Sequence, residues 1–193
     1  MEPRAIRVDA VPPQPWRNGG GITRELLAAP GPDAEQWQWR VSVADIERDG
    51  AFSSWPGVKR WFAVLEGAGV ALTIDGAAHV VTPKSFALRF DGDASTACRL
   101  LDGPTRDLNL MLRGARGALE KVVAAQDWRP AASQCGLYAT SAGRCRADDA
   151  EFDVLARSLL WFDAAPATLR FVATSPPVDC GWWLSVTPRE GER

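Results

Sequence analysis

The sequence predicts an all-β fold of the sandwich or barrel type. Apolar and polar residues alternate along short runs, and Gly, Pro and Asp residues separate these runs at the spacing typical of such folds. No stretch shows the apolar periodicity of a long amphipathic helix. A chain of 193 residues can also bury a stable core without disulfide bonds or metal ions. Both one compact unit and two small half-domains fit these observations.

The alternation places strands in two sets along the chain. The first set is expected at Ala5–Val8, Ile22–Ala28, Gln36–Ala44, Arg60–Glu66, Val70–Ile74, His79–Val81, Phe86–Phe90, Cys98–Leu101 and Arg106–Leu112. The second set is expected at Leu119–Val123, Gly136–Thr140, Phe152–Leu155, Ser158–Phe162, Leu169–Val172 and Trp182–Val186. The stretch Gly114-Ala115-Arg116-Gly117 separates the sets, so we expect a first half at residues 1–113 and a smaller half at 114–193, packed together.

Composition and charge exclude several classes of protein. The chain is 46% apolar with a formal charge of −2, so it has no basic surface typical of nucleic-acid binding. No apolar run approaches the roughly 18 residues of a membrane span. Residues 1–7 lack the apolar stretch of a signal peptide, which predicts a cytoplasmic protein. Neither nucleic acid nor a membrane is therefore expected as a partner.

The cysteines and the histidine do not form a recognisable site. Cys98, Cys135, Cys145 and Cys180 lie far apart without Cys-x-x-Cys spacing, so we expect reduced and mostly buried thiols. The single histidine, His79, follows a hairpin signal and is expected at the surface. A catalytic cysteine would require a nearby imidazole, which this pattern does not provide.

The segment Pro15-Trp16-Arg17-Asn18-Gly19-Gly20-Gly21-Ile22-Thr23-Arg24-Glu25 carries the densest chemistry in the chain. It places an aromatic ring, an amide, a hydroxyl and two guanidiniums around three glycines, which permit close backbone approach. One interpretation is a ligand pocket that uses Trp16, Asn18, Gly20 and Thr23. The other is a tight turn that enters a strand. Both interpretations remain open on residue types alone.

This segment resembles the signature of the HutD/Ves family of cupin-like bacterial proteins. Further stretches agree with it in order and spacing, namely residues 39–44, 52–69 and 102–111. The resemblance implies a cupin-type (RmlC-like) β-sandwich or barrel, a bicupin in one chain, with the main pocket in the first half. It also implies an association with histidine utilisation and stress-related roles, without an established catalytic activity.

The resemblance gives Arg60 a specific place. When the turn at residues 64–69 is aligned with the first cupin motif, Arg60 takes the position of the metal-binding glutamate, and Ser54 and Pro56 take those of the two histidines. These residue types cannot hold a metal ion, whereas a guanidinium suits a carboxylate. We therefore predict a metal-free protein without cofactors whose pocket binds an anion. A surface arginine that stacks on Trp61 or pairs with an acid is the alternative.

Strand alternation assigns further candidates to faces. Arg40 and Ser42 share one face of their strand, and Asp107 and Asn109 share one face of another. Each of these faces could simply be exposed to solvent. The family resemblance instead favours faces that line a cavity. Glu25, on the face of Thr23, is expected to pair with a nearby arginine.

Three functional hypotheses follow. The first is a metal-free protein that binds a small carboxylate or amide, with N-formylglutamate and urocanate as candidates, and modulates histidine utilisation. The second is a metal-independent isomerase, lyase or amidohydrolase with Asp107 or Glu25 as base. The third is a structural module whose interior is filled by residues such as Phe62 and Met111. A homodimer is left open in each case.

Overall fold

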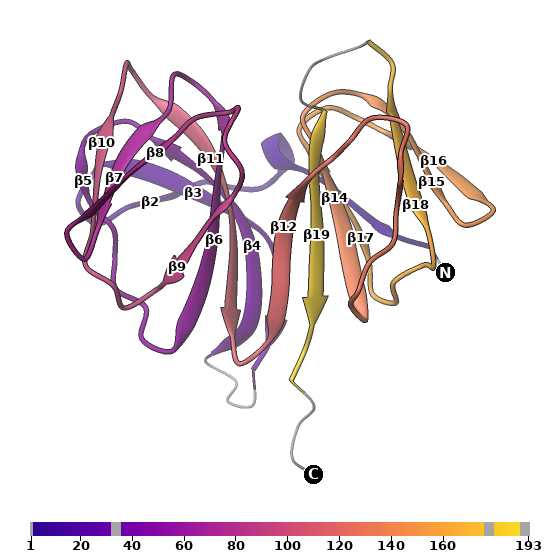
Figure 1. The fold of residues 1–193 in the computed structure, drawn as a ribbon, viewed down its shortest axis with the longest axis horizontal. Coiled ribbons are helices and arrows are strands. Elements are labelled where there is room, and N and C mark those ends of the chain that lie inside the picture. The colour runs from indigo at the N-terminus through magenta and orange to yellow at the C-terminus, as the bar shows by residue number, and fades with distance from the viewer. Residues whose placement is uncertain (1, 32–35, 176–179, 190–193) are drawn as a thin grey trace. The chain divides into compact units, whose positions relative to one another are not determined.

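The computed structural model describes residues 2–31, 36–175 and 180–189, and these form β-strands almost throughout (Figure 1). The expected all-β fold is confirmed, with one short 3-10 turn, η1 (Val8–Ala10), among the described residues. The chain divides into two compact units. We call residues 12–115 the N-terminal sandwich, and residues 2–11 with the described part of 116–188 the C-terminal sandwich.

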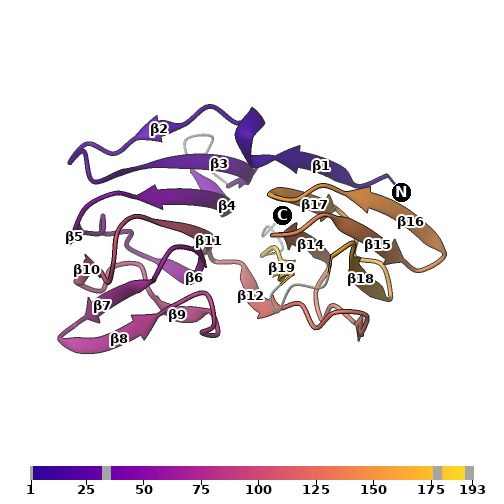
Figure 2. The ribbon, with the colours of Figure 1, turned by 90° about the horizontal axis from the view of Figure 1, so that it is seen from above.

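The N-terminal sandwich consists of two antiparallel sheets. A six-stranded sheet has the order β2-β3-β4-β11-β6-β9, and a four-stranded sheet has the order β5-β10-β7-β8 (Figure 2). The strands are β2 (Gln14–Pro15), β3 (Gly21–Pro30), β4 (Trp37–Ile46), β5 (Gly50–Ala51), β6 (Val58–Glu66), β7 (Val70–Ile74), β8 (Ala77–Val81), β9 (Leu88–Asp91), β10 (Thr96–Leu100) and β11 (Thr105–Arg113).

The register of β4, β11 and β6 arranges inward-facing side chains in rows. Met111 on β11 lies opposite Arg40 on β4 and Arg60 on β6. One step along the strands, Asn109 lies opposite Ser42 and Phe62. A further step places Asp107 opposite Ala44 and Val64. The side chains of each row therefore share one level inside the sandwich.

Apolar side chains fill the rest of this interior. Val70, Leu72 and Val81 from the four-stranded sheet pack with Phe62 and Val64 from the six-stranded sheet. Trp16 and Phe52 lie partly buried against this cluster. The rows that contain Arg40, Arg60, Ser42 and Asn109 therefore lie beside an apolar core.

The C-terminal sandwich repeats the two-sheet plan. Its sheets have the orders β1-β17-β14-β19-β12 and β13-β18-β15-β16. The strands are β1 (Arg4–Arg7), β12 (Arg116–Lys121), β13 (Asp127–Trp128), β14 (Gln134–Ala139), β15 (Gly143–Ala147), β16 (Ala150–Val154), β17 (Ser158–Phe162), β18 (Leu169–Ala173) and β19 (Gly181–Thr187). The sequence boundary grouped residues 1–113, but β1 forms an antiparallel backbone ladder with β17 and becomes the edge strand of that sheet, so residues 2–11 group with the C-terminal strands.

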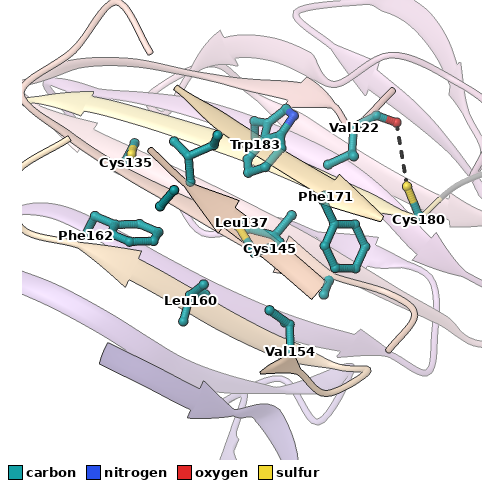
Figure 3. Close-up of a cluster of buried hydrophobic side chains, with 13 residues drawn as sticks. Val122, Cys135, Leu137, Cys145, Val154, Leu160, Phe162, Phe171, Cys180 and Trp183 are labelled. Atoms are coloured by element: carbon teal, nitrogen blue, oxygen red, sulfur yellow. Dashed lines mark hydrogen bonds between the residues drawn. The ribbon is translucent and has the colours of Figure 1, made fainter. Parts of the chain in front are cut away.

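Side chains fill the interior of the C-terminal sandwich. Leu137, Phe162, Phe171 and Trp183 point toward one another between the sheets (Figure 3). The Cys180 thiol lies 3.9 Å from the carbonyl oxygen of Val122. All four cysteines of the chain are free and buried, as expected. Burial raises the pKa of the Cys98, Cys135 and Cys145 thiols to about 12, so they remain protonated.

Within the described ranges, no helix is long and apolar enough to cross a membrane.

Candidate functional site

The N-terminal sandwich contains a cavity of about 610 Å³. Charged, polar and aromatic side chains of β3, β4, β6 and β11 border it, together with the segments before β3 and before β6. Its lining comprises Gln14, Pro15, Trp16, Arg17, Asn18, Thr23, Glu25, Arg40, Ser42, Ala44, Ile46, Ala51, Phe52, Ser53, Ser54, Trp55, Arg60, Phe62, Asn109 and Met111.

Most of the residues proposed from the sequence come together here. Those in the lining are Trp16, Asn18, Thr23, Arg40, Ser42, Arg60 and Asn109. Gly20 and Asp107 are not among the lining residues. Gly20 is buried, and its N–H donates a 3.0 Å hydrogen bond to Oδ1 of Asn18, so it holds that side chain in place.

The glycine-rich segment is a tight turn that also borders the cavity. The N–H of Gly19, at φ +66°, donates to the carbonyl of Trp16 at 3.0 Å, and the N–H of Trp16 donates to the carbonyl of Gly21 at 2.9 Å. A Cβ on Gly21 would lie 2.3 Å from the carbonyl oxygen of Asp45, so β3 can begin so close to β4 only with glycine. The two interpretations of this segment are thus compatible.

Arg60 is the most deeply buried cation of the site. It is only 8% exposed, and its guanidinium carbon lies 4.9 Å from the Phe52 ring centroid and 5.1 Å from that of Phe90. Its Nη2 donates to Oδ1 of Asn109 at 3.1 Å, and Nε has no acceptor among the described residues. Burial, with a smaller contribution from Arg40, lowers the pKa of Arg60 to about 10, so it stays charged at neutral pH.

No carboxylate among the described residues lies within 4.0 Å of the Arg60 guanidinium. A buried cation without a counter-ion is costly, and this cation faces a cavity large enough for a small molecule. The site therefore offers a place for an external anion.

Arg40 supplies a second guanidinium. It lies 5.6 Å from the ring centroid of Trp37 and 5.5 Å from that of Trp55. Its Nη1 is 3.7 Å from Oε2 of Glu25, and its Nε is buried without an acceptor in the part of the chain that the structure describes. Burial lowers the pKa of Arg40, and the charge of Glu25 partly opposes this shift. The expected pairing of Glu25 with an arginine is present as a loose contact.

Aromatic side chains form the apolar part of the cavity wall. Trp16 donates from Nε1 to Oγ1 of Thr23 at 2.7 Å and meets Phe52 edge to face at 6.4 Å. The ring centroids of Phe52 and Phe62 are 5.9 Å apart. Phe62 and Met111 line the cavity without filling it.

Asp107 lies one row deeper than Asn109 and is completely buried. Its Oδ2 accepts a 2.9 Å hydrogen bond from Oγ1 of Thr105, and Oδ1 has no partner among the described residues. Burial raises the pKa of Asp107 to about 8 despite this hydrogen bond, and the charge of Asp45 adds to the effect.

The side chains of this site do not fit a metal ion. The cavity lining contains the guanidiniums of Arg17, Arg40 and Arg60 and one carboxylate, Glu25, whose nearest charge is Arg40. His79 lies on β8 and is not among the lining residues. Across the described part of the chain, no three His, Cys, Asp or Glu side chains gather as metal ligands. Cations would repel a metal ion at Arg60, so the chemistry of the donor set favours an anion.

Sequence reasoning did not assign a role to two parts of the site region. Phe52, Ser53 and Trp55 form a wall of the cavity, and only their place in a family motif signalled this. Asp45, on the opposite face of β4, accepts hydrogen bonds from Arg24 at 2.7 Å and Arg106 at 2.6 Å. Burial would raise the pKa of Asp45, but these two arginines outweigh burial and lower it. This cluster ties β3, β4 and β11 together.

A second depression, of about 450 Å³, lies on the exposed side of β15, β16 and β18. The guanidinium of Arg144 lies 3.4 Å from a carboxylate oxygen of Glu151 and also from one of Asp153. The guanidinium of Arg170 lies 2.7 Å from a carboxylate oxygen of Asp127. Because its charges are paired and solvated, this depression is the weaker candidate.

The two-sheet β-sandwich is a fold of the cupin type. A cupin 2 barrel protein from Leptotrichia buccalis superposes with a TM-score of 0.57, 9% identity and 98% coverage of both chains, a likeness of fold alone. The family model HutD matches residues 9–176. The chain therefore belongs to the HutD family.

Named relatives agree with this assignment. A 21.2 kDa protein from the hutC 3′ region of Pseudomonas putida is 39% identical over 55% of this chain, and the match spans just over half, 56%, of that relative. Protein Ves of Citrobacter koseri is 33% identical over 69% of this chain and 70% of its own length. The structure of HutD from Pseudomonas fluorescens has a TM-score of 0.83 and 27% identity, covering 97% of this chain and 100% of the other.

Proposed function

We propose that the protein binds a small carboxylate in the cavity of the N-terminal sandwich and modulates histidine utilisation. The observation that carries this proposal is the buried Arg60 guanidinium, which faces the cavity without a counter-ion among the described residues. The names of the Pseudomonas relatives support the pathway. N-formylglutamate and urocanate are the candidate ligands.

The chemistry of the site favours binding over catalysis. Thr23, Ser42 and Ser54 line the cavity, but the chain's one imidazole, His79, is not among the lining residues. A hydroxyl without an activating base is a weak nucleophile. Asp107, one of the two candidate bases, is also outside the lining.

Calorimetric titration of protein analysed for metal content tests this function. We expect saturable binding of at least one probe among N-formylglutamate, urocanate, histidine and glutamate. Arg60→Met should weaken that binding at least tenfold, because a charge-assisted hydrogen bond to a carboxylate contributes roughly 1.5–3 kcal/mol. Arg99→Met is the matched control, since Arg99 is exposed on β10 of the same sandwich and is not among the lining residues.

Two results would contradict the proposal. One is the absence of binding by the intact protein for every probe. The other is binding that Arg60→Met and Arg99→Met change equally, because the effect would then reflect net charge. NMR spectra of the probe before and after incubation separate binding from turnover, and conversion of the probe would favour the metal-independent enzyme instead.

A further inference from the structure

The cavity is lined by a carboxylate that receives no hydrogen bond from the residues that the structure describes. Glu25 lies on β3 opposite Ser42, and it is the only acid among the described residues that line the cavity. Its side chain is 39% exposed. The nearest cationic atom, Nη1 of Arg40, is 3.7 Å away, which exceeds the length of a hydrogen bond. Glu25 therefore keeps free acceptor capacity toward the cavity.

The same cavity contains buried donors without acceptors. Nε of Arg40 and Nε of Arg60 are both unpartnered within the described structure. A simple carboxylate would neutralise the Arg60 charge at the cavity and leave Glu25 without a donor. It would also be repelled by the Glu25 charge. Only a ligand with both an anionic group and an N–H donor matches both sets of side chains.

Of the two guanidiniums, Arg40 lies next to Glu25, whereas Arg60 lies farther along the six-stranded sheet. Glu25 is on β3 and Arg60 is on β6, with β4 and β11 between these strands. Neighbouring strands are about 4.8 Å apart, so the two backbones are separated by roughly 14 Å along the sheet. Both side chains line the cavity, whose volume of about 610 Å³ has room for a molecule of the size of an amino acid.

Resting on the carboxylate-binding function proposed above, we propose that the ligand is an amino acid or an amide derivative of one. Its carboxylate binds on the Arg60 side, and its N–H group donates to Glu25. Glu25 is thus the residue that distinguishes such ligands from plain carboxylates.

Matched pairs of probes test this inference. Glutamate and glutarate differ only in the amino group, as do histidine and 3-(imidazol-4-yl)propanoate. For the intact protein we expect the amino-bearing member of a pair to bind at least tenfold tighter, the equivalent of one hydrogen bond to a charged group. Glu25→Gln should reduce this ratio to near one. Glu47→Gln, which removes the same charge from an exposed position outside the cavity lining, should leave the ratio unchanged.

The outcomes separate this inference from the function on which it rests. If glutarate binds as tightly as glutamate and Arg60→Met weakens both, the site binds carboxylates and the role of Glu25 is refuted. The same conclusion follows if Glu25→Gln tightens both members of each pair equally, because Glu25 then only neutralises Arg40. If no member of either pair binds the intact protein, the inference on Glu25 fails, and binding of N-formylglutamate or urocanate then decides the proposed function separately.

Discussion

Asp107 is the carboxyl group whose environment differs most from water. Its buried Oδ1 has no partner among the described residues, and burial raises its pKa to about 8 from an unfolded value near 3.8. Between these two pH values the unfolded chain loses a proton that the folded protein keeps. The folded state is therefore penalised as pH rises through this window, by up to roughly 1.4 kcal/mol per pH unit.

Replacing Asp107 by Asn should remove this pH-dependent penalty. The neutral amide keeps an oxygen for the hydrogen bond from Thr105, although its buried NH₂ costs some stability at all pH values. We expect the stability difference, variant minus wild type, to become more favourable to the variant as pH rises from 5 to 8. Urea denaturation at both pH values measures this difference, with exposed Asp102→Asn as control. A difference that stays constant with pH would mean that Asp107 is already ionised in the folded protein.

The case of Asp107 also shows what alternation along a strand can predict. It places Asp107 and Asn109 on one face of β11, whereas the expectation that this face points inward came from the family resemblance; both side chains are buried. Alternation does not predict how deeply each of these side chains is buried. Two residues on the same face of a strand differ in burial only because different parts of the opposite sheet cover them. Arg60 likewise needed the alignment with the cupin motif, since an arginine beside an aromatic residue also fits a surface.

At the scale of elements, the clearest requirement is the start of β3. The backbone of Gly21 pairs with Ile46, and an added Cβ would lie 2.3 Å from the carbonyl oxygen of Asp45. Backbone atoms of a central strand cannot move without disturbing the ladder beyond them. The turn before β3 carries Trp16 and Asn18, so this close approach also positions part of the cavity wall.

Gly21→Ala should therefore destabilise the protein by more than about 2 kcal/mol, a size typical of strained or overpacked positions. Gly50→Ala is the matched control, because its added Cβ would come no closer than 3.7 Å to Asn18 and its φ is not in the left-handed region. Urea denaturation of both variants makes the comparison. Equal, small effects would show that β3 and β4 can separate at little cost.

Most strands were predictable because their inward residues are large and apolar. Val70–Ile74 and Ser158–Phe162 are found at the predicted bounds. Gly143–Ala147 was missed because its inward residues are small and its outward residues, Arg144 and Arg146, are charged. The two-residue strands β2, β5 and β13 are too short for any periodicity to show.

At the scale of the whole molecule, two sandwiches of similar plan have different interiors. The N-terminal sandwich keeps a cavity of about 610 Å³ beside its core, whereas large side chains such as Trp183 and Phe171 fill the interior of the C-terminal sandwich. A filled interior contributes stability, and an open one leaves polar groups free for a ligand. We therefore expect a ligand to bind in the N-terminal unit, and the packed C-terminal unit to contribute mainly to stability.

A pair of phenylalanine substitutions tests this division. Phe171→Ala leaves a void in a packed interior and should cost about 3–5 kcal/mol, with little effect on the affinity of the folded protein for glutamate. Phe52→Ala enlarges an existing cavity, so it should cost less stability, and it should weaken glutamate binding several-fold because it removes the ring beside Arg60. Chemical denaturation and calorimetry measure the two quantities separately. If Phe171→Ala weakens binding as much as Phe52→Ala while the protein remains folded, the two functions are not divided between the sandwiches.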